Sequence, residues 1–200
     1  MAWRYEIRLA GSGGQGIILM GIILAKAIGL YEGYYVTQTQ SYGPEARGGA
    51  SKAEIVVSDE EIDYPKVIKP NLFLAMNQKA FDNFITDVDR DGIVIIDSTN
   101  VDLIPVMSTF DIPFSRLGRE KFGREIMANI IALGAITEIT DMVSQESMKE
   151  AVLESIPKGT EEMNLKALDV GIEAGKKAKN AGAKRAFPTE VPQKGILGYY

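Results

Sequence analysis

The segment YEIRLAGSGGQGIILMGIILA, residues 5–25, sets the architecture of this 200-residue chain. Its first six residues alternate apolar and polar side chains as a strand does, and the apolar run from Ile17 to Ala25 is long enough for a helix. Between them, Gly11, Gly13 and Gly16 match G-x-G-x-x-G in the strand–turn–helix setting that this motif requires. We expect the first amides of the helix to face an anion, which the helix dipole favours. The alternative is a tight turn that packs closely and binds no ligand.

A nicotinamide dinucleotide site would lack one of its usual contacts in this chain. Such sites have Asp or Glu at the end of the second strand, about 20 residues after the glycines, where the acid binds the ribose. The second strand is predicted at Tyr34–Val36 and ends in Thr37 and Gln38, whereas Glu32 precedes it. No basic residue stands at that strand end to take a 2′-phosphate. NAD(P) binding is therefore the less favoured hypothesis.

A second motif, TQTQSYGPEARGG at residues 37–49, is predicted to be a recognition loop. It is polar and longer than a hairpin turn needs, and long loops in compact domains are usually functional or disordered. Because a strand is predicted directly after it, at residues 53–57, we favour a function. Arg47 offers a planar fork of donors to phosphate or carboxylate, or forms an ion pair with Glu45. Tyr42 stacks on a purine or, more simply, packs in the core or an interface.

The remaining pattern predicts one α/β domain. The run Gly92–Asp97 is continuous and β-branched, as expected of a parallel strand buried on both faces. We predict a three-layer, Rossmann-like domain over residues 1–182, with a largely parallel sheet and helices on both faces. Residues 183–200 are predicted to be a tail that either is mobile or docks on a partner. Further strands are predicted at 71–77 and, as short extended pieces, at 104–106 and 110–113; helices are predicted near 79–86, 120–139, 144–154 and 160–180.

Polar side chains that follow the predicted strands complete the candidate site. Asn77, Gln78 and Asp97 are expected at the carboxyl edge of the sheet beside the glycine motif, where open α/β sheets bind ligands. Ser12 and Gln15 can donate to a phosphate or can satisfy local backbone groups. We predict no catalytic and no metal-ligating residue. The candidate ligand contacts are Gly11, Ser12, Gly13, Gly14, Gln15, Gly16, Tyr42, Glu45, Arg47 and Asn77.

The composition narrows the possible functions. The chain has no cysteine and no histidine, which removes iron–sulfur ligation by cysteine, disulfides, typical zinc sites and the commonest general base. A net charge of −5 argues against a nucleic-acid partner. The apolar run from Ile17 to Leu30 is too short for a membrane span and contains Lys26, and the first residues carry no signal pattern, so we expect a cytoplasmic protein without a membrane partner. This composition suits a subunit that binds and positions better than an autonomous catalyst.

The two motifs together resemble one known family. The segments GSGGQG at 11–16, SYGPEARGG at 41–49 and SDEEIDYP at 58–65 are similar to gamma subunits of 2-oxoacid:ferredoxin oxidoreductases. The resemblance extends over roughly residues 5–180. The form EARGG at 45–49 is most like that of subunits of 2-oxoglutarate or branched-chain 2-oxoacid enzymes, and 2-oxoglutarate is favoured.

The resemblance implies a role in a multisubunit enzyme. Such an enzyme oxidatively decarboxylates a 2-oxoacid, makes an acyl-coenzyme A and reduces ferredoxin. Thiamine diphosphate, magnesium and iron–sulfur clusters would lie in the alpha, beta and ferredoxin-like delta subunits, while this chain would cover the active site and help to bind coenzyme A. The chain alone is expected to be inactive. Two alternatives stay open: a stand-alone nucleotide-dependent oxidoreductase, and a nucleotide-sensing module that catalyses no reaction.

The helix predicted from Ile17 is apolar nearly all round. Lys26 is its first clear charge, whereas an exposed helix normally has a polar face. We therefore expect the sheet to cover one side, and either residues 127–136 or another molecule to cover the other. The second possibility predicts self-association, through a surface near the glycine motif and residues 42–49, when the partner subunits are absent.

Overall fold

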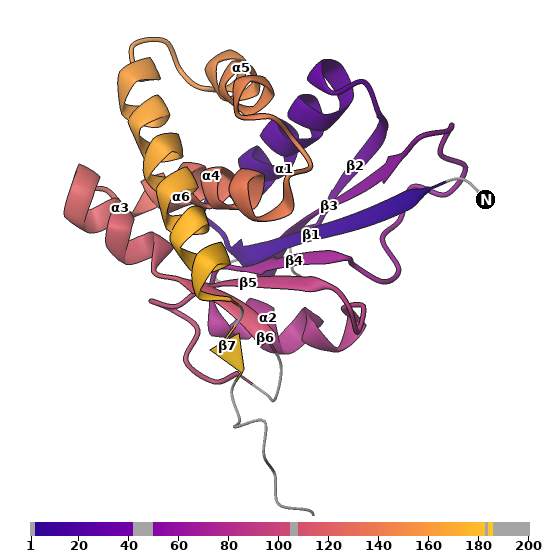
Figure 1. Ribbon diagram of the computed structural model, residues 1–200, viewed down its shortest axis with the longest axis horizontal. Coiled ribbons are helices and arrows are strands. Elements are labelled where there is room, and N and C mark those ends of the chain that lie inside the picture. The colour runs from indigo at the N-terminus through magenta and orange to yellow at the C-terminus, as the bar shows by residue number, and fades with distance from the viewer. Residues whose placement is uncertain (1–2, 42–49, 105–107, 183, 186–200) are drawn as a thin grey trace, which may run out of the picture.

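The computed structural model describes residues 3–41, 50–104, 108–182 and 184–185, which form one mixed sheet with helices on both faces (Figure 1). The strand order across the sheet is β2-β3-β1-β4-β5-β6-β7. The strands are β1 (Arg4–Ser12), β2 (Tyr35–Ser41), β3 (Ala50–Ser58), β4 (Leu72–Ala75), β5 (Ile93–Asp97), β6 (Ser108–Ile112) and β7 (Lys184–Arg185).

Helices lie in the connections that follow β1, β4 and β6. A π-helical turn at Ala27–Tyr31 continues the first helix. A 3-10 turn at Ile85–Asp87 follows the second helix, and another at Glu125–Met127 precedes the fourth. None of the helices in these ranges has the length and the apolar run that crossing a membrane requires. The helices are α1 (Ile17–Lys26), α2 (Gln78–Phe84), α3 (Phe114–Phe122), α4 (Ala128–Thr140), α5 (Gln145–Ser155) and α6 (Glu161–Ala181).

The sheet is parallel in its centre and antiparallel beyond β1. The neighbouring strands β1, β4, β5 and β6 run parallel, which confirms the predicted Rossmann-like core. In contrast, β3 pairs antiparallel with β1, and β2 pairs antiparallel with β3. The prediction that Thr37–Ser41 belong to a loop is wrong, because these residues continue β2. Their alternation of threonine and glutamine suits a strand, and the register places Val36 opposite Val57 and Gln38 opposite Ile55.

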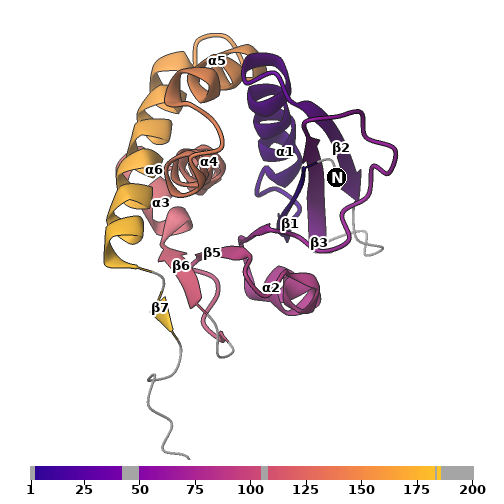
Figure 2. The same ribbon diagram turned by 45° about the vertical axis from the view of Figure 1, so that its right-hand side comes forward.

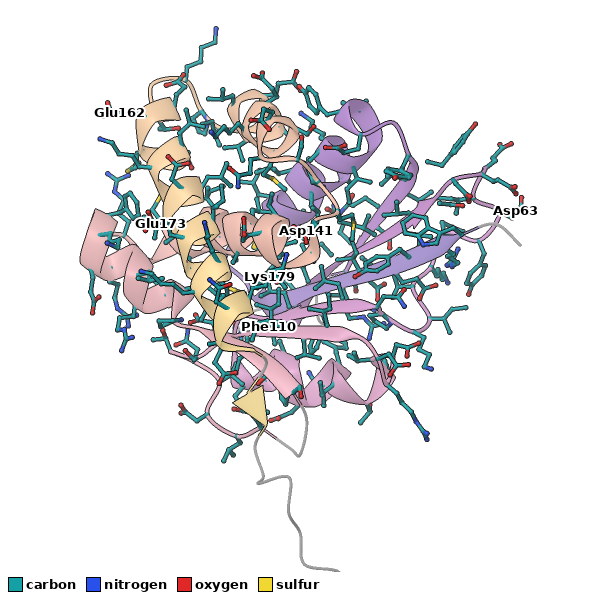
Figure 3. All side chains as sticks on the ribbon, viewed as in Figure 1. Asp63, Phe110, Asp141, Glu162, Glu173 and Lys179 are labelled. Carbon is teal, nitrogen blue, oxygen red and sulfur yellow. The ribbon has the colours of Figure 1, made fainter. Side chains whose placement is uncertain are left out.

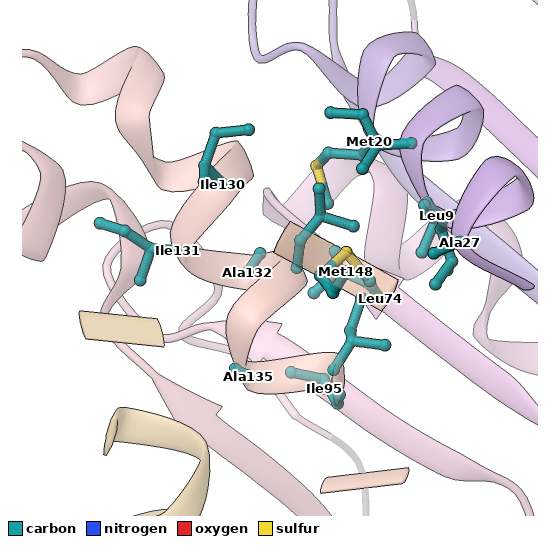
Figure 4. Packing of buried hydrophobic residues seen from close by; sticks show 14 of the residues in the cluster. Leu9, Met20, Ala27, Leu74, Ile95, Ile130, Ile131, Ala132, Ala135 and Met148 are labelled. Carbon is teal, nitrogen blue, oxygen red and sulfur yellow. The ribbon is translucent and has the colours of Figure 1, made fainter. Parts of the chain in front are cut away.

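Alternation along the strands sends apolar side chains into two separate cores. Leu9 and Leu74 lie in the larger core, under α1, α4, α5 and α6 (Figure 4). Phe73 and Val94 point to the opposite face, where they form a smaller cluster with Phe81 of α2. The three predicted layers are therefore present, but unevenly filled: of the described helices, α2 alone lies on the second face (Figure 2).

The helix predicted at 120–139 is wrong as a single element. The chain forms α3 and α4 there, with a break between them. Gly123 adopts a left-handed conformation with φ 65°, and its amide bonds back to Arg119 O at 3.0 Å, which ends α3. A new helix then begins at Ala128, so the chain gains a second helix start on this side of the sheet.

The first helix is covered mainly from within the chain. Met20 and Leu24 are buried, and Met20 belongs to one cluster with Ile130 of α4 and Met148 of α5 (Figure 4). The predicted internal cover by residues 127–136 is thus present, and α5 adds a part that the sequence did not predict. Ile22 keeps 39 % of its surface exposed. Self-association through this region stays a prediction.

Helices α4 and α6 meet backbone to backbone. A Cβ atom on Gly171 of α6 would lie 2.8 Å from the carbonyl carbon of Ile131 and 3.0 Å from the Cα of Gly134, both in α4. The crossing therefore admits only hydrogen at this position. Further along, Lys179 of α6 pairs with Asp141, which follows the last residue of α4 (Figure 3).

The last described strand lies past the predicted domain end. Lys184 and Arg185 pair with Thr109 and Ser108 of β6, so the sheet takes in two residues after position 182. Residues 186–200 lie outside the described ranges, and the division into domain and tail stays a prediction.

Candidate functional site

The glycine motif forms an open turn between β1 and α1. Gly14 and Gly16 have φ of 90° and 74°, conformations that L side chains rarely adopt. Gly13 and Gly14 are exposed, and a Cβ atom on either would meet nothing within 4 Å. A Cβ on Gly11, in contrast, would lie 2.6 Å from Gln15 Oε1. The inner part of the turn is therefore closely packed, and its outer part has room for a ligand.

Gln15 braces the turn from inside. Its Oε1 accepts hydrogen bonds from Ser12 N at 2.7 Å and from Asn77 Nδ2 at 3.1 Å. Its Nε2 donates to Met76 O at 3.1 Å. Gln15 makes the local contacts predicted for it, to Ser12 N at the end of β1 and to Met76 O just after β4, while a contact to a phosphate stays a prediction. Gln15 is a positioning residue.

Asn77 joins the turn to the start of α2, as its place after β4 predicted. Its Nδ2 also donates to Ser12 Oγ at 2.6 Å, and its Oδ1 accepts from Ala80 N at 2.8 Å, which caps α2. Ser12 accepts in this contact, and its own hydroxyl hydrogen has no acceptor among the described residues. Ser12 is therefore able to donate to a ligand above the turn, and Asn77 holds it there.

The first amides of α1 have no acceptor among the described residues, whereas amides at the starts of α3 and α4 have one. Asp97 accepts from Ser115 N at 3.2 Å, and Thr99 Oγ1 accepts from Arg116 N at 3.2 Å, which caps α3. The first amide of α4 bonds to the 3-10 turn before it. Among the described residues, no side chain caps α1, and no acid stands in its first turn. Its first amides therefore remain available, and they carry the positive end of the helix dipole.

Two residues predicted beside the turn have structural roles. Asp97 lies at the carboxyl edge as expected, but its carboxylate is used on α3. Gln78 points to the segment after β5: its Oε1 accepts from Asp102 N and Leu103 N, both at 3.0 Å. Neither side chain reaches the glycine turn in a described contact.

A cavity of about 150 Å³ opens beside the turn. It lies between the beginnings of α1, α3 and α4, and Glu125 at its rim pairs with Arg119 at 2.6 Å. Its volume equals about five water molecules, enough for one phosphate group but not for a whole nucleotide. The sequence points only to the turn residues; Glu125, Ile126 and Ala128 are missed because it predicts a continuous helix over them. The cavity is lined by Gly14, Gln15, Met76, Ser115, Glu125, Ile126 and Ala128.

The residues that follow the second motif lie beside this turn. Tyr42, Glu45 and Arg47 lie outside the described residues. The residue that follows the motif, Ala50, is directly opposite Ser12 in the β1–β3 register. The next residue, Ser51, donates its hydroxyl to Gly11 O at 3.3 Å. The two sequence motifs are thus tied to the same edge of the sheet.

Comparison with known proteins identifies the family. Residues 6–174 match the family model described as pyruvate ferredoxin/flavodoxin oxidoreductase. The chain is 51 % identical over 177 residues to the 2-oxoglutarate synthase subunit KorC of Methanocaldococcus jannaschii, an alignment that covers 86 % of this chain and 95 % of that one. The chain therefore belongs to the pyruvate ferredoxin/flavodoxin oxidoreductase family.

Solved structures place it more closely within that family. The gamma subunit of a keto/oxoacid ferredoxin oxidoreductase from Geobacter sulfurreducens has a TM-score of 0.80 and 40 % identity, over 88 % of this chain and 99 % of that one. A 2-oxoglutarate:ferredoxin oxidoreductase from Magnetococcus marinus, solved with 2-oxoglutarate, coenzyme A and succinyl-CoA bound, has a TM-score of 0.77 and 25 % identity. That match covers 87 % of this chain and 31 % of the longer chain. The predicted resemblance is confirmed: this is a gamma-type subunit of a 2-oxoacid:ferredoxin oxidoreductase.

Proposed function

We propose that this chain is the gamma subunit of an enzyme that oxidatively decarboxylates 2-oxoglutarate, forms succinyl-CoA and passes the electrons to ferredoxin. Within it, the chain covers the active site and binds a phosphate of coenzyme A at the start of α1. The observation that carries the second part is the uncapped helix start beneath an open glycine turn. The choice of 2-oxoglutarate is supported by the 51 % identity to a 2-oxoglutarate synthase subunit.

The donors at the turn match a phosphate group better than a neutral ligand. The first amides of α1 and the Ser12 hydroxyl are donors, and the helix dipole adds positive potential at the same point. The carboxylate of Glu125 at the cavity rim is paired with Arg119, which offsets its charge. The cavity takes one phosphate. The remainder of coenzyme A would extend over the exposed glycines towards partner subunits.

The proposal extends to Arg47, which lies outside the described residues but close to Ala50 in the sequence. Three peptide units separate it from Ala50, so its Cα lies no farther than about 11 Å from the Cα of Ala50. Ala50 pairs with Ser12, at the base of the glycine turn. A guanidinium on so short a tether is able to form a charge-assisted bond to a phosphate oxygen at the turn. Tyr42 and Glu45 belong to the same tethered segment and complete the proposed contact set.

The electron-transfer and decarboxylation groups belong to other chains in this proposal. Without cysteine, this chain supplies no thiolate for an iron–sulfur cluster. Among its described residues, no three acidic side chains come together as a metal site. Thiamine diphosphate, magnesium and the clusters are therefore assigned to alpha, beta and ferredoxin-like delta partners.

The dinucleotide alternative loses support from the sheet. A Rossmann site uses a second strand that runs parallel beside β1 and ends in an acid. Here the strand after α1 is β2, which lies two positions from β1 and pairs antiparallel with β3. Its residues Thr37 and Gln38 offer no carboxylate to a ribose. A nucleotide-sensing module without enzyme partners does not fit relatives that are oxidoreductase subunits.

The isolated chain is expected to have no 2-oxoacid oxidation activity. It has neither cysteine nor histidine, so it supplies no thiolate for an iron–sulfur cluster and no imidazole base. The purified chain is assayed with 2-oxoglutarate, coenzyme A and a viologen dye, and then assayed again after mixing with the partner subunits co-purified from the native source. Dye reduction by the chain alone at the rate of the assembled enzyme would contradict the proposal.

Removing the Arg47 side chain is expected to weaken coenzyme A binding. A lost charge-assisted hydrogen bond is worth about 1.5–3 kcal/mol, which raises the KM for coenzyme A by about 10- to 150-fold in the assembled enzyme. The matched control is Arg90→Ala, which removes an exposed arginine just before β5, at the opposite edge of the sheet. Equal KM values for Arg47→Ala and Arg90→Ala would remove Arg47 from the site.

A further inference from the structure

Asn129 is a buried polar residue in an apolar segment. It is the second residue of α4 and has only 4 % of its surface exposed. It is the one polar side chain in the run from Ala128 to Ile136. Its Oδ1 accepts from Ile130 N at 2.7 Å, which sets the orientation of the amide and leaves Nδ2 on the other side.

The Nδ2 atom of Asn129 points at the start of α1. A Cβ atom on Gly16 would overlap this nitrogen and would lie 3.2 Å from Asn129 Cγ. Gly16 is the residue that precedes α1, and it gives the amide room to approach. No described residue accepts a hydrogen bond from Nδ2. Nδ2 is not among the fully enclosed side-chain atoms without a partner, so this donor is open to solvent or to a ligand.

This donor and the uncapped helix are independent features at one place. Gly16 follows Gln15, and Asn129 follows Ala128; Gln15 and Ala128 both line the 150 Å³ cavity. The amides of α1 come from backbone, whereas Nδ2 comes from a side chain of a helix about 110 residues later in the chain. Both are neutral donors without an acceptor in the described structure. A ligand with several oxygen acceptors satisfies them together.

We propose that Asn129 is a ligand-contacting residue whose Nδ2 donates a hydrogen bond to an oxygen of the phosphate group bound at the start of α1. The proposal rests on the proposed function and adds a residue to it. It also assigns a role to Gly16: any side chain there would displace the Asn129 amide from the phosphate. The ligand class is a phosphate-bearing thiol such as coenzyme A, recognised here through its phosphate and not through its thiol.

The test is Asn129→Asp in the assembled enzyme. Aspartate has the same shape but presents a charged acceptor where the amide presents a donor, and an acid in the first turn of α4 suits the helix dipole, so the fold is retained. The KM for coenzyme A is expected to rise by about 10- to 100-fold, while the KM for 2-oxoglutarate stays the same. With pantetheine, which has no phosphate, the variant and the wild type are expected to be equally active.

The matched control is Asn164→Asp. Asn164 is another buried asparagine, 7 % exposed, near the start of α6, and its Nδ2 donates to Thr160 O at 2.9 Å. This change removes a structural hydrogen bond far from the turn, so thermal unfolding shifts and the KM for coenzyme A does not. The same unfolding measurement on Asn129→Asp separates loss of fold from loss of ligand.

Each outcome decides between the two proposals. If Gly13→Asp, which places a charge at the turn, raises the KM for coenzyme A and a folded Asn129→Asp does not, the assignment of Asn129 is overturned and the phosphate site stands. If neither variant changes that KM, both proposals fall. Equal losses with coenzyme A and with pantetheine would show a structural role for Asn129 and would also overturn the inference.

Discussion

Gly171→Val is expected to lower the free energy of unfolding of this chain by more than about 3 kcal/mol. The added Cβ would lie 2.8 Å from the carbonyl carbon of Ile131 and 3.0 Å from the Cα of Gly134. Overpacking a core against side chains typically costs about 1–3 kcal/mol, because side chains can rotate away. Here the neighbour is the backbone of α4, which can move only as a whole. Domains have only about 5–15 kcal/mol of stability, so a large share is at stake.

The measurement is urea unfolding followed by circular dichroism, with Lys176→Val as the control. Lys176 is an exposed residue of the same helix, so valine there changes helix propensity by only a few tenths of a kcal/mol. The two variants carry the same new side chain and differ in the presence of a neighbouring helix. Similar midpoints for both would mean that α4 and α6 do not cross at Gly171.

The sequence predicts α6 but not what it packs against. Its length and its charge order, with Glu161 and Glu162 at the start and Lys179 near the end, are local signals. Gly171 reads locally as a weak point in a helix, because glycine costs about 1 kcal/mol relative to alanine there. The structure explains this glycine, because the lack of a side chain at position 171 lets α6 approach the backbone of α4. A local pattern holds no information about the partner.

The errors in the sheet have the same origin. The parallel strand β5 was predicted because it is continuous and β-branched. The polar character of Thr37–Ser41 predicts a loop, yet these residues pair along β3. Whether a threonine–glutamine run forms a strand depends on the neighbour that supplies the hydrogen bonds. Likewise, α3 ends where Gly123 adopts a left-handed conformation. A glycine in the sequence allows this conformation but does not require it.

The site was predictable where one motif builds it and not where distant segments meet. The glycine turn and Asn77 were found because each follows a strand whose carboxyl end defines the edge. Glu125 and Asn129 were missed, because the predicted helix at 120–139 made them ordinary helix residues. One signal is present in the sequence: Asn129 is the single polar residue in the apolar run from Ala128 to Ile136, and a buried polar side chain needs a hydrogen-bond partner.

Gly13→Asp is expected to raise the KM for coenzyme A of the assembled enzyme by about 100-fold or more. Gly13 is exposed, its φ is not positive, and a Cβ there meets nothing within 4 Å, so the turn accommodates a side chain. The new carboxylate stands beside the uncapped start of α1, where it competes with the phosphate for the same amides and repels it. Like charges brought together cost several kcal/mol, and each 1.4 kcal/mol is about tenfold in affinity.

The same carboxylate stabilises the fold, so that unfolding would not explain a rise in the KM for coenzyme A. An acid near a helix start contributes about 0.3–1 kcal/mol through the dipole, so thermal unfolding is expected at an equal or higher temperature while coenzyme A binding is lost. Gly13→Asn is the matched control, because it has the same shape without the charge and should change the KM little. Added salt should narrow the difference between the two variants, since it screens exposed charges. If Gly13→Asp and Gly13→Asn have the same KM at low salt, no phosphate approaches the start of α1, and the uncapped helix needs another explanation.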